Sequence, residues 1–450
     1  MRQSPNRQSR EAAMSTDESG SSESSSDDSA VANTVTDEPL SPSVIAQFVR
    51  HDRCPRYLKQ KLADDPEPDG REWREAFQLV NVAHLEYGQE FEATQLEAFA
   101  TNATKIVGPD GEDSTQASVP DIDYDETWAA SSEAQTDQLQ TAAKEAASLP
   151  ADTDTPPYIL CYQAPLGGQI GNFDLWGEVD CLVFAPESAT EAVDELDLPT
   201  PATTVDSPHG SSPESSATAP ASRHPQATDS DATIVARVLE IKSAKKRKPA
   251  HHVQGVIYSS LLEQMLSTDA TPAYRREASI LTQPMAELSD DSLHPLAVPT
   301  FQLPEWECYT EPLLAAGGTV ETVLQGNLDD LPFAIDRVCN NCEFQEACTT
   351  YAVEKPTTPA SLALLGYSPA VQGRLQDAGV TSIRNLSELL PPQRNTDPTE
   401  EPPTLDLPAE QQRDLEEILP EPIHETVLHA QALRSEIDPK YPDGSDESPA

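Results

Sequence analysis

The sequence predicts an α/β fold, in which a mixed sheet flanked by helices is followed by a small all-α C-terminal domain. Apolar segments rich in β-branched and aromatic residues predict strands at 158–163, 173–184, 233–243 and 277–283. Apolar residues at helical spacing predict helices at 41–62, 73–100, 251–266 and 307–325. Helices that precede and separate the strands indicate the α/β class. Beyond about residue 358 the recurring patterns are helical only.

The N-terminal part of the chain passes from a polar tail to helices. Residues 1–40 are rich in Ser, Asp and Glu and are expected to be disordered. Ser41 or Ser43 then caps the first helix of a domain that covers 41–350. The segment near 101–157 is polar and poorly periodic, which indicates an insert in this domain.

The central strands are interrupted by a second insert. The segment 186–231 is rich in Ser, Pro, Thr and Asp and lies between the strands at 173–184 and 233–243. These two strands are therefore expected to form a hairpin that carries a flexible insert. The helical domain covers 358–437, and residues 438–450 are expected to be disordered.

The chain is strongly acidic. Its 450 residues include 29 Lys and Arg against 77 Asp and Glu, a net charge of −48. An acidic surface can bind basic partners, or it can keep a protein soluble at high salt. Acidic residues are spread along the whole chain, which favours adaptation to high salt. The acidity then does not exclude nucleic-acid binding.

Neither a membrane span nor a signal peptide is indicated, because no apolar run reaches about 18 residues and no apolar N-terminal leader segment is present. We expect a cytoplasmic protein without a membrane partner. Met14 opens the acidic stretch MSTDESG and is a second candidate translation start beside Met1. The chain also lacks a P-loop motif, so no ATP-driven motor is expected.

Two consecutive predicted strands carry acidic residues and a lysine. Side chains alternate along a strand, so Glu240 and Lys242 share a face and Ile241 points into the core. Asp180 converges with them if the two strands pair. Two carboxylates and a main-chain carbonyl, that of Ile241, suit Mg²⁺ or Mn²⁺. Such an ion polarises a phosphodiester and activates water, and the lysine can orient that water or stabilise charge on phosphorus.

The following helix continues this constellation. Gln254 and Tyr258 are four residues apart and share a helix face, where they can contact a nucleotide. A Glu-x-Lys alone is common on surface strands. The order Gly-x-x-Asp, Glu-x-Lys and Gln-x-x-x-Tyr is what favours a metal-dependent nuclease site.

The scarce positive charge is concentrated between this strand and this helix. A patch that could follow a phosphate backbone is expected from Lys245, Lys246, Arg247 and Lys248, with His251 and His252. A basic run of this length also occurs as a solvated loop or a localisation signal, and that alternative stays open.

These motifs resemble the PD-(D/E)XK nuclease superfamily, in its RecB-like branch. The resemblance covers about 41–350 and implies a restriction-endonuclease-like sheet, with Asp180 and Glu240 as metal ligands and catalytic residues and Lys242 as the catalytic lysine. It also implies substrate-binding roles for Gln254 and Tyr258. Relatives have a further metal ligand on an upstream helix, and Glu92 takes that position here.

The chain departs from the RecB-like pattern at one place. The upstream helix carries Gly88 in the stretch YGQEFE, as the resemblance requires. Phe91 stands where many relatives have a histidine, and His84 lies on the other side of Gly88.

The chain has seven cysteines, an odd number, and no export signal is indicated. Both observations argue against a disulfide framework. Cys339, Cys342 and Cys348 follow the spacing C-x2-C-x5-C, and Cys54 lies far upstream in RCPRYL. Four thiolates can hold an iron–sulfur cluster or a tetrahedral zinc ion, and the spacing does not decide between them. Buried free cysteines are a third reading.

The resemblance implies the iron–sulfur cluster. In the iron–sulfur group of RecB-like nucleases, which includes AddB-type and CRISPR-associated members, one cysteine precedes the core and three follow it. A 4Fe–4S cluster on Cys54, Cys339, Cys342 and Cys348 is therefore expected, with zinc as the alternative and with a mainly structural role.

The C-terminal helical region resembles a helix-hairpin-helix element, a DNA-backbone binding unit. Gly366 and Gly379 lie at its turns, and Ser368 stands where a second turn glycine is usual. A helical packing module is the open alternative.

Together these features predict a Mg²⁺- or Mn²⁺-dependent deoxyribonuclease that acts on single strands or free ends in repair, recombination or replication. A separate helicase subunit is a plausible partner for such an enzyme. The alternatives are a non-catalytic DNA-binding scaffold subunit of a helicase–nuclease complex, a CRISPR adaptation nuclease and a zinc-stabilised adaptor.

Overall fold

The structure is a computed structural model. It describes residues 39–62, 71–109, 126–150, 155–194, 233–268, 271–288, 293–328, 331–335, 338–390 and 408–437. The expected terminal tails at 1–40 and 438–450 lie outside these residues, except for positions 39 and 40, and so does most of the expected insert at 186–231.

The described residues form a mixed six-stranded sheet, as the α/β prediction requires. The strand order is β2-β1-β3-β4-β5-β6. Pairing is parallel for β2–β1–β3 and β5–β6 and antiparallel for β3–β4–β5. The strands are β1 (Lys105–Gly108), β2 (Glu126–Thr127), β3 (Ile159–Ile170), β4 (Phe173–Pro186), β5 (Ile234–Lys242) and β6 (Tyr274–Thr282).

The hairpin expected between the two motif-bearing strands is confirmed. Strands β4 and β5 pair antiparallel from Pro186↔Ile234 to Cys181↔Leu239. The helix α6 (Pro249–Leu266) then connects β5 to its parallel neighbour β6. Strand β3 is longer than expected, because it continues through Gly167 and Gly168, whose lack of side chains hides the alternating pattern.

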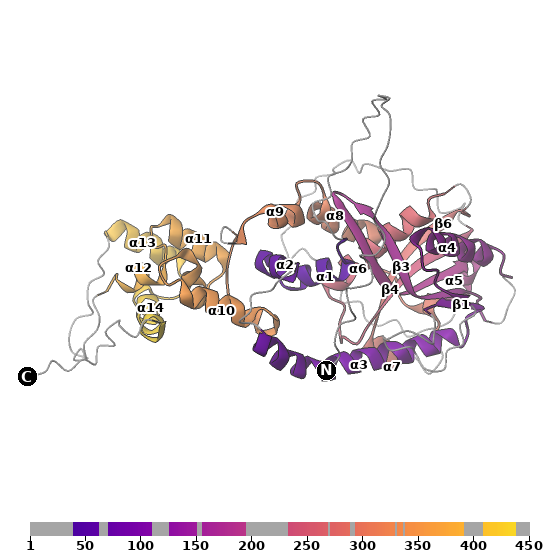
Figure 1. The fold of residues 1–450 in the computed structure, drawn as a ribbon, viewed down its shortest axis with the longest axis horizontal. Coiled ribbons are helices and arrows are strands. Elements are labelled where there is room, and N and C mark those ends of the chain that lie inside the picture. Colours follow the sequence, from indigo (N-terminus) through magenta and orange to yellow (C-terminus); the bar gives the residue numbers. More distant parts are fainter. Residues whose placement is uncertain are drawn as a thin grey trace, which may run out of the picture. The chain divides into compact units, whose positions relative to one another are not determined.

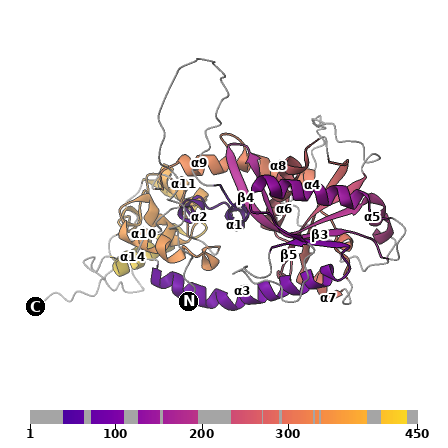
Figure 2. The same ribbon diagram turned by 45° about the vertical axis from the view of Figure 1, so that its right-hand side comes forward.

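Helices cover both faces of the sheet, and Figure 2 shows the strands between α3 on one side and α4 and α6 on the other. One core, here called the first core, joins the sheet to α1, α4 and α6. A second core joins the opposite side to α3 and α5. The further helices up to residue 354 are α3 (Arg71–Ala100), α4 (Ser132–Ala147), α5 (Glu187–Asp194), α7 (Gln283–Leu288), α8 (Leu303–Leu314), α9 (Thr319–Gln325) and α10 (Gln345–Glu354).

The strand faces change sides at Gln163. This residue has φ +45°, a left-handed conformation that breaks side-chain alternation. Before it, Leu160 and Tyr162 lie in the second core, whereas the even-numbered Ala164 beyond it lies in the first core. Asp180 of β4 lies at the same level, between the pairs Tyr162↔Cys181 and Ala164↔Val179. The side chains of β3 therefore change the face to which they point next to the predicted acidic site.

The helix expected at 41–62 is divided into two. Helix α1 (Pro42–Arg50) is capped by Ser41, whose Oγ accepts a hydrogen bond from the Ser43 amide at 3.2 Å. Asp52 and Arg53 then have φ of +52° and +58°, which ends the helix. Helix α2 (Pro55–Lys61) starts at a proline, the residue best suited to a first helical position.

The segment 101–157, predicted to be an insert from its weak periodicity, carries part of the sheet and one of its covering helices. Strand β1 and helix α4 lie within this segment, and both contribute to the first core. The buried stripe of α4 consists of Leu139, Ala142, Ala143 and Ala146. Alanine gives little hydropathy contrast, so the 3.6-residue period is weak in the sequence although the burial is complete.

The helix predicted at 307–325 is also divided into two in the structure. The segment Ala315–Gly318 separates α8 from α9, and Gly317 there has φ +71°. The regular secondary structure of the described residues beyond 358 is helical (Figure 1). They share a hydrophobic cluster of their own between Leu362 and Ala430. Whether they form a separate domain stays a prediction. Their elements are a 3₁₀ helix (Pro359–Leu365), α11 (Pro369–Asp377), α12 (Ile383–Ser387), α13 (Ala409–Ile418) and α14 (Ile423–Ile437).

No helix among the described residues combines the length and the apolar character that crossing a bilayer requires.

Candidate active site

The strands β4 and β5 separate at Asp180, and the aspartate side chain continues the hydrogen bonding there. The last backbone pair is Cys181↔Leu239. One step further, the Ile241 amide donates to Asp180 Oδ2 at 2.7 Å, and Lys242 Nζ donates to the same oxygen at 2.9 Å. The separation of the strands thus holds one carboxylate beside the end of the neighbouring strand.

Glu240 is the most buried member of this group. Its side chain has 0 % exposure, and Lys242 Nζ lies 2.6 Å from its Oε2. Glu240 Oε2 is therefore paired with the lysine, whereas Oε1 has no hydrogen-bond partner within the described part of the chain. A buried carboxylate with unused lone pairs is costly unless a cation completes its surroundings.

Helix α3 contributes Glu92 to the same place. Gly88, one turn earlier, lies against the end of β5, because a Cβ there would be 3.5 Å from Ser243 Oγ. The proximity of Glu92 to the other acids is seen in its pKa, which burial and then the charge of Asp180 raise to about 8. Burial and the charge of Asp180 also raise the pKa of Glu240 to about 7.

Lys242 is the counter-charge of these acids. Burial favours its neutral form, but the charges of Asp180 and Glu240 outweigh burial and raise the pKa of Lys242 above its ordinary value. The lysine therefore stays protonated near neutral pH. One ammonium faces the three carboxyl groups of Glu92, Asp180 and Glu240, which leaves an excess of negative charge when all three are ionised.

This excess of negative charge favours the binding of a cation such as Mg²⁺ or Mn²⁺. No three His, Cys, Asp or Glu side chains among the described residues stand in the arrangement of a bound metal ion. The donor set nevertheless fits a hard divalent cation, because Glu92, Asp180 and Glu240 converge and Glu240 Oε1 has no partner among the described residues. The Ile241 carbonyl follows directly after Glu240 on the same strand.

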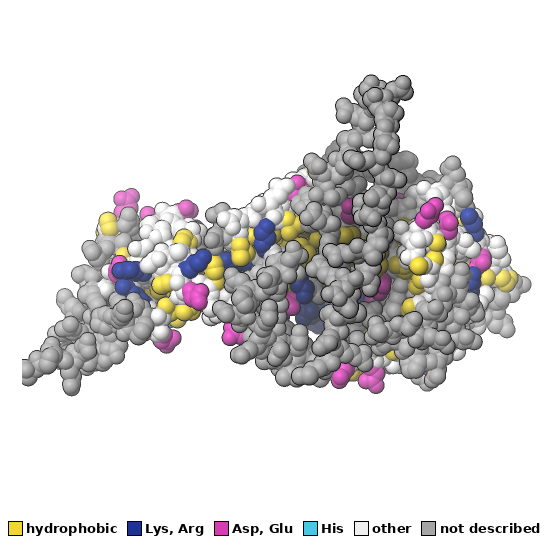
Figure 3. Space-filling view, viewed as in Figure 1, with side chains coloured by type: hydrophobic (Ala, Val, Ile, Leu, Met, Phe, Trp, Pro, Cys, Tyr) yellow, Lys and Arg dark blue, Asp and Glu magenta, His cyan; other side chains and the backbone are white. Residues whose placement is uncertain are grey.

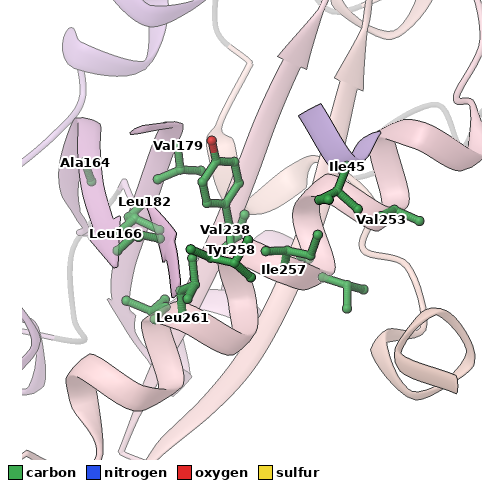
Figure 4. Close-up of a cluster of buried hydrophobic side chains, with 14 of the residues drawn as sticks. Ile45, Ala164, Leu166, Val179, Leu182, Val238, Val253, Ile257, Tyr258 and Leu261 are labelled. Carbon is green, nitrogen blue, oxygen red and sulfur yellow. The ribbon is translucent and has the colours of Figure 1, made fainter. Parts of the chain in front are cut away.

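Tyr258 lies deeper than the sequence suggested. Its side chain is 2 % exposed, and Figure 4 shows its ring beside Val179, with the hydroxyl oxygen pointing away from the cluster. That hydroxyl donates to the Glu178 carbonyl at 2.8 Å. Tyr258 thus ties α6 to β4 two residues before Asp180. Gln254, half-buried one turn earlier, hydrogen-bonds the Tyr258 hydroxyl.

The basic run is partly built into the fold. Lys245, Lys246 and Lys248 are exposed, whereas Arg247 is half-buried and donates to the Pro299 carbonyl at 3.0 Å. Burial lowers the pKa of Arg247. Three of the four side chains are therefore free to meet a polyanion, and the fourth fixes the loop. On the face seen in Figure 3, Lys and Arg side chains form separate small groups.

The two histidines that follow are neutral at pH 7. Burial and then the charge of Lys242 lower the pKa of His251 to about 3. Burial lowers the pKa of His252 to about 4. His252 stacks on Trp306 with ring centroids 4.2 Å apart, so it belongs to the contact between α6 and α8. Neither histidine adds positive charge to the patch.

One further cation near this patch was missed from the sequence. Arg50, exposed in the last turn of α1, lowers the pKa of both Lys248 and His251 through its charge. It lies nearly 200 positions upstream of the basic run, and no periodic signal links the two segments.

The four cysteines assigned to a cluster come together. Cys54 precedes α2, and Cys339, Cys342 and Cys348 lie at the start of α10 or just before it. Burial, with added contributions from the neighbouring thiols, raises the pKa of Cys342 and of Cys348 to about 12. A cavity of about 800 Å³ is lined in part by Cys54, Cys339 and Cys342.

Four soft donors, three of which line one cavity, fit an iron–sulfur cluster or a zinc ion. The other three cysteines lie elsewhere: Cys161 and Cys181 are buried in strands, and Cys308 is exposed on α8.

Comparison with known proteins adds no further assignment, because no family model, no curated protein and no solved structure matches the chain.

Proposed function

We propose that the chain is a metal-dependent deoxyribonuclease with a restriction-endonuclease-like core of the RecB-like type. The observation that carries this proposal is the convergence of Asp180, Glu240 and Lys242, with Glu92 beside them, where β4 and β5 separate. The excess negative charge, and Glu240 Oε1, which has no partner among the described residues, support a divalent cation at this point.

Mg²⁺ or Mn²⁺, when bound, would polarise a phosphodiester and lower the pKa of a water molecule. Glu92, Asp180 and Glu240, with the Ile241 carbonyl, would hold it. The role of Lys242 follows from its protonation: an ammonium donates hydrogen bonds and cannot accept a proton. It would therefore orient the attacking water or stabilise charge on a phosphate oxygen, and would not act as a general base.

The exposed Lys245, Lys246 and Lys248, together with Arg50, would bind the phosphates of the strand that approaches this site. Tyr258 and Gln254 would act differently from the basic residues. Because Tyr258 is buried and bonded to the Glu178 carbonyl, its contribution is to fix β4 near Asp180. Gln254, less buried, is the member of the pair better able to reach a nucleotide.

Cys54, Cys339, Cys342 and Cys348 would hold a 4Fe–4S cluster that joins the two ends of the 41–350 segment. The four thiols and the adjoining cavity support this assignment, and zinc is the competing occupant.

The proposal also includes a substrate and a partner. The enzyme would act on single strands or free ends in repair, recombination or replication, beside a separate helicase subunit. Two glycines in the left-handed conformation, Gly366 and Gly379, are in keeping with a helix-hairpin-helix role for the C-terminal helices.

The test is cleavage by anaerobically purified protein. Single- and double-stranded oligonucleotides, labelled at either end, are incubated in molar KCl with Mg²⁺, with Mn²⁺ or with EDTA. We expect metal-dependent cutting that falls about 100-fold or more in Lys242→Ala and in Glu240→Ala. Lys105→Ala, which removes a surface lysine paired with Glu145 at 2.9 Å, serves as the control and retains full activity.

The fragment ladder distinguishes exonuclease from endonuclease cutting. Cleavage that persists in EDTA or in Lys242→Ala would contradict the proposal. Tight DNA binding without cleavage by a folded, metal-loaded protein would support the alternative, a non-catalytic scaffold subunit.

A further inference from the structure

A buried arginine lies beside the cysteines. Arg56 is the second residue of α2, two positions after Cys54, and its side chain is 1 % exposed. Removing a guanidinium from water costs several kcal/mol unless opposite charge and hydrogen bonds replace the lost hydration. The surroundings of Arg56 should therefore contain a compensating negative group.

Aromatic rings provide only part of this compensation. The Arg56 Cζ lies 4.4 Å from the centroid of the Phe333 ring and 3.9 Å from that of Tyr351. Such cation–π contacts attract the guanidinium but bring no negative charge. Among the described residues no carboxylate pairs with Arg56, and its buried Nε has no hydrogen-bond partner. Within the described part of the chain, the rings hold this charge in place and no carboxylate neutralises it.

The thiols are candidates for this negative charge. Cys348 and Tyr351 are three residues apart on α10, so they share a helix face, and Tyr351 is the ring that Arg56 contacts most closely. Burial raises the pKa of Cys348, and Arg56 is the next largest influence and the one that lowers it, while the three other cysteines raise it. Arg56 is thus within electrostatic reach of the Cys348 sulfur.

We propose that Arg56 is the buried counter-charge of the group held by the four cysteines and that it sets the reduction potential of that group. The inference rests on the iron–sulfur part of the proposed function. Four thiolates make a bound cluster anionic, and one-electron reduction increases its negative charge. A fixed cation beside it stabilises the reduced form more than the oxidised form, because net charge is one of the main determinants of cluster potential.

The experiment is a reductive titration of the iron-loaded full chain with dithionite and redox dyes, followed by electron paramagnetic resonance. Arg56→Met removes the charge and keeps most of the volume. We expect the ratio of reduced to oxidised cluster at a fixed potential to fall about tenfold, which is about 59 mV for a one-electron couple.

Lys355 provides a matched control, because it contacts the same Tyr351 ring as Arg56. Lys355 Nζ lies 4.2 Å from the Tyr351 centroid, but its charge is not among the largest influences on the pKa of Cys342 or of Cys348. Lys355→Met should therefore leave the potential unchanged. An iron-loaded Arg56→Met with the potential of the unsubstituted protein would overturn the inference and leave the nuclease proposal intact.

Arg56→Lys separates charge from packing if Arg56→Met fails to load iron. Iron retained by Arg56→Lys, at a potential close to that of the unsubstituted protein, supports the counter-charge. Equal loss of iron from both variants shows that stacking between the rings, and not charge, is what matters. An unsubstituted protein that binds no iron removes the cluster from the proposed function and this inference with it.

Discussion

At the scale of single residues, the main feature of the candidate site is an excess of negative charge. Asp180, Glu240 and Glu92 face one protonated Lys242, and burial has removed most of the water that would screen them. The fold holds these acids close together by binding Asp180 to the Ile241 amide. Without a cation, protonation of one or two acids is the remaining way to reduce the repulsion.

The metal-free protein should therefore lose stability as the pH rises. The folded-state pKa values of Glu240 and Glu92, about 7 and about 8, lie above the ordinary 4.5. Their stabilising contribution is complete below about pH 4.5 and is lost as the pH rises through the folded values. Glu240→Gln should remove much of this loss, so that its melting temperature exceeds that of the unsubstituted protein at about pH 8 but not at about pH 5.

Thermal melts in EDTA at several pH values check this prediction. Buried histidines such as His251 titrate in the opposite sense, so the variants are compared with the unsubstituted protein at each pH. Glu145→Gln, which removes an acid from a surface pair, provides the control. Mn²⁺ should raise the melting temperature more at about pH 8 than at about pH 5. An equal effect at both values would count against a cation at these carboxylates.

At the scale of elements, the site depends on how α6 approaches β4. The Tyr258 hydroxyl reaches the Glu178 carbonyl because Gly177 has no side chain. A Cβ at Gly177 would lie 2.9 Å from that hydroxyl and 3.0 Å from Pro42 Cδ. Pro42 is the first residue of α1, so one glycine permits two helices to pack against the strand that carries Asp180.

Gly177→Ala should destabilise the protein by about 1–3 kcal/mol, the usual range for overpacking. It should also reduce cleavage, because β4 has to move. The measurement is a denaturant titration of Gly177→Ala, Tyr258→Phe and the double variant. Loss of the hydroxyl should relieve part of the clash, so that the double variant is less destabilised than the sum of the two.

Gly373→Ala in α11 serves as the control for these variants. A Cβ at Gly373 meets no heavy atom within 4 Å, so alanine should be neutral or stabilising there. Strict additivity of Gly177→Ala and Tyr258→Phe would show that the hydroxyl does not cause the strain.

At the scale of the whole molecule, the four cysteines connect segments far apart in the chain. Cys54 lies before α2, and the other three lie almost 300 residues later. A group bound by all four closes this long segment, and a crosslink of that kind stabilises the fold mainly by restricting the unfolded chain. The binding free energy of such a group also becomes folding free energy.

Cys54→Ser and Cys342→Ser should each lose iron and melt at least about 5 °C lower than the unsubstituted protein. Iron and zinc content, visible absorbance and thermal melts under anaerobic conditions measure the outcome. Cys308→Ser, on the exposed cysteine of α8, should retain both the metal content and the melting temperature. Full iron content in Cys54→Ser would remove Cys54 from the ligand set, and zinc in place of iron would change the identity of the group.

The sequence alone determined the parts of this protein that depend on local periodicity. The alternation of side chains in LEIKS placed Glu240 and Lys242 on one face, and the pairing of two apolar strands across a polar segment brought Asp180 to them. The helix that follows was located from its apolar spacing, and the cysteines from their spacing. These signals come from residues that are close together in the chain, so they can be recognised without knowledge of the fold.

Only the tertiary structure decided what surrounds those residues. The left-handed Gln163, the alanine stripe of α4, the neutral His251, and the placement of Arg50 and Arg56 have no periodic signal. Each depends on contacts between segments that are distant in the chain. Charge and burial act through space, so the protonation of a site and the position of its counter-charges are properties of the folded molecule.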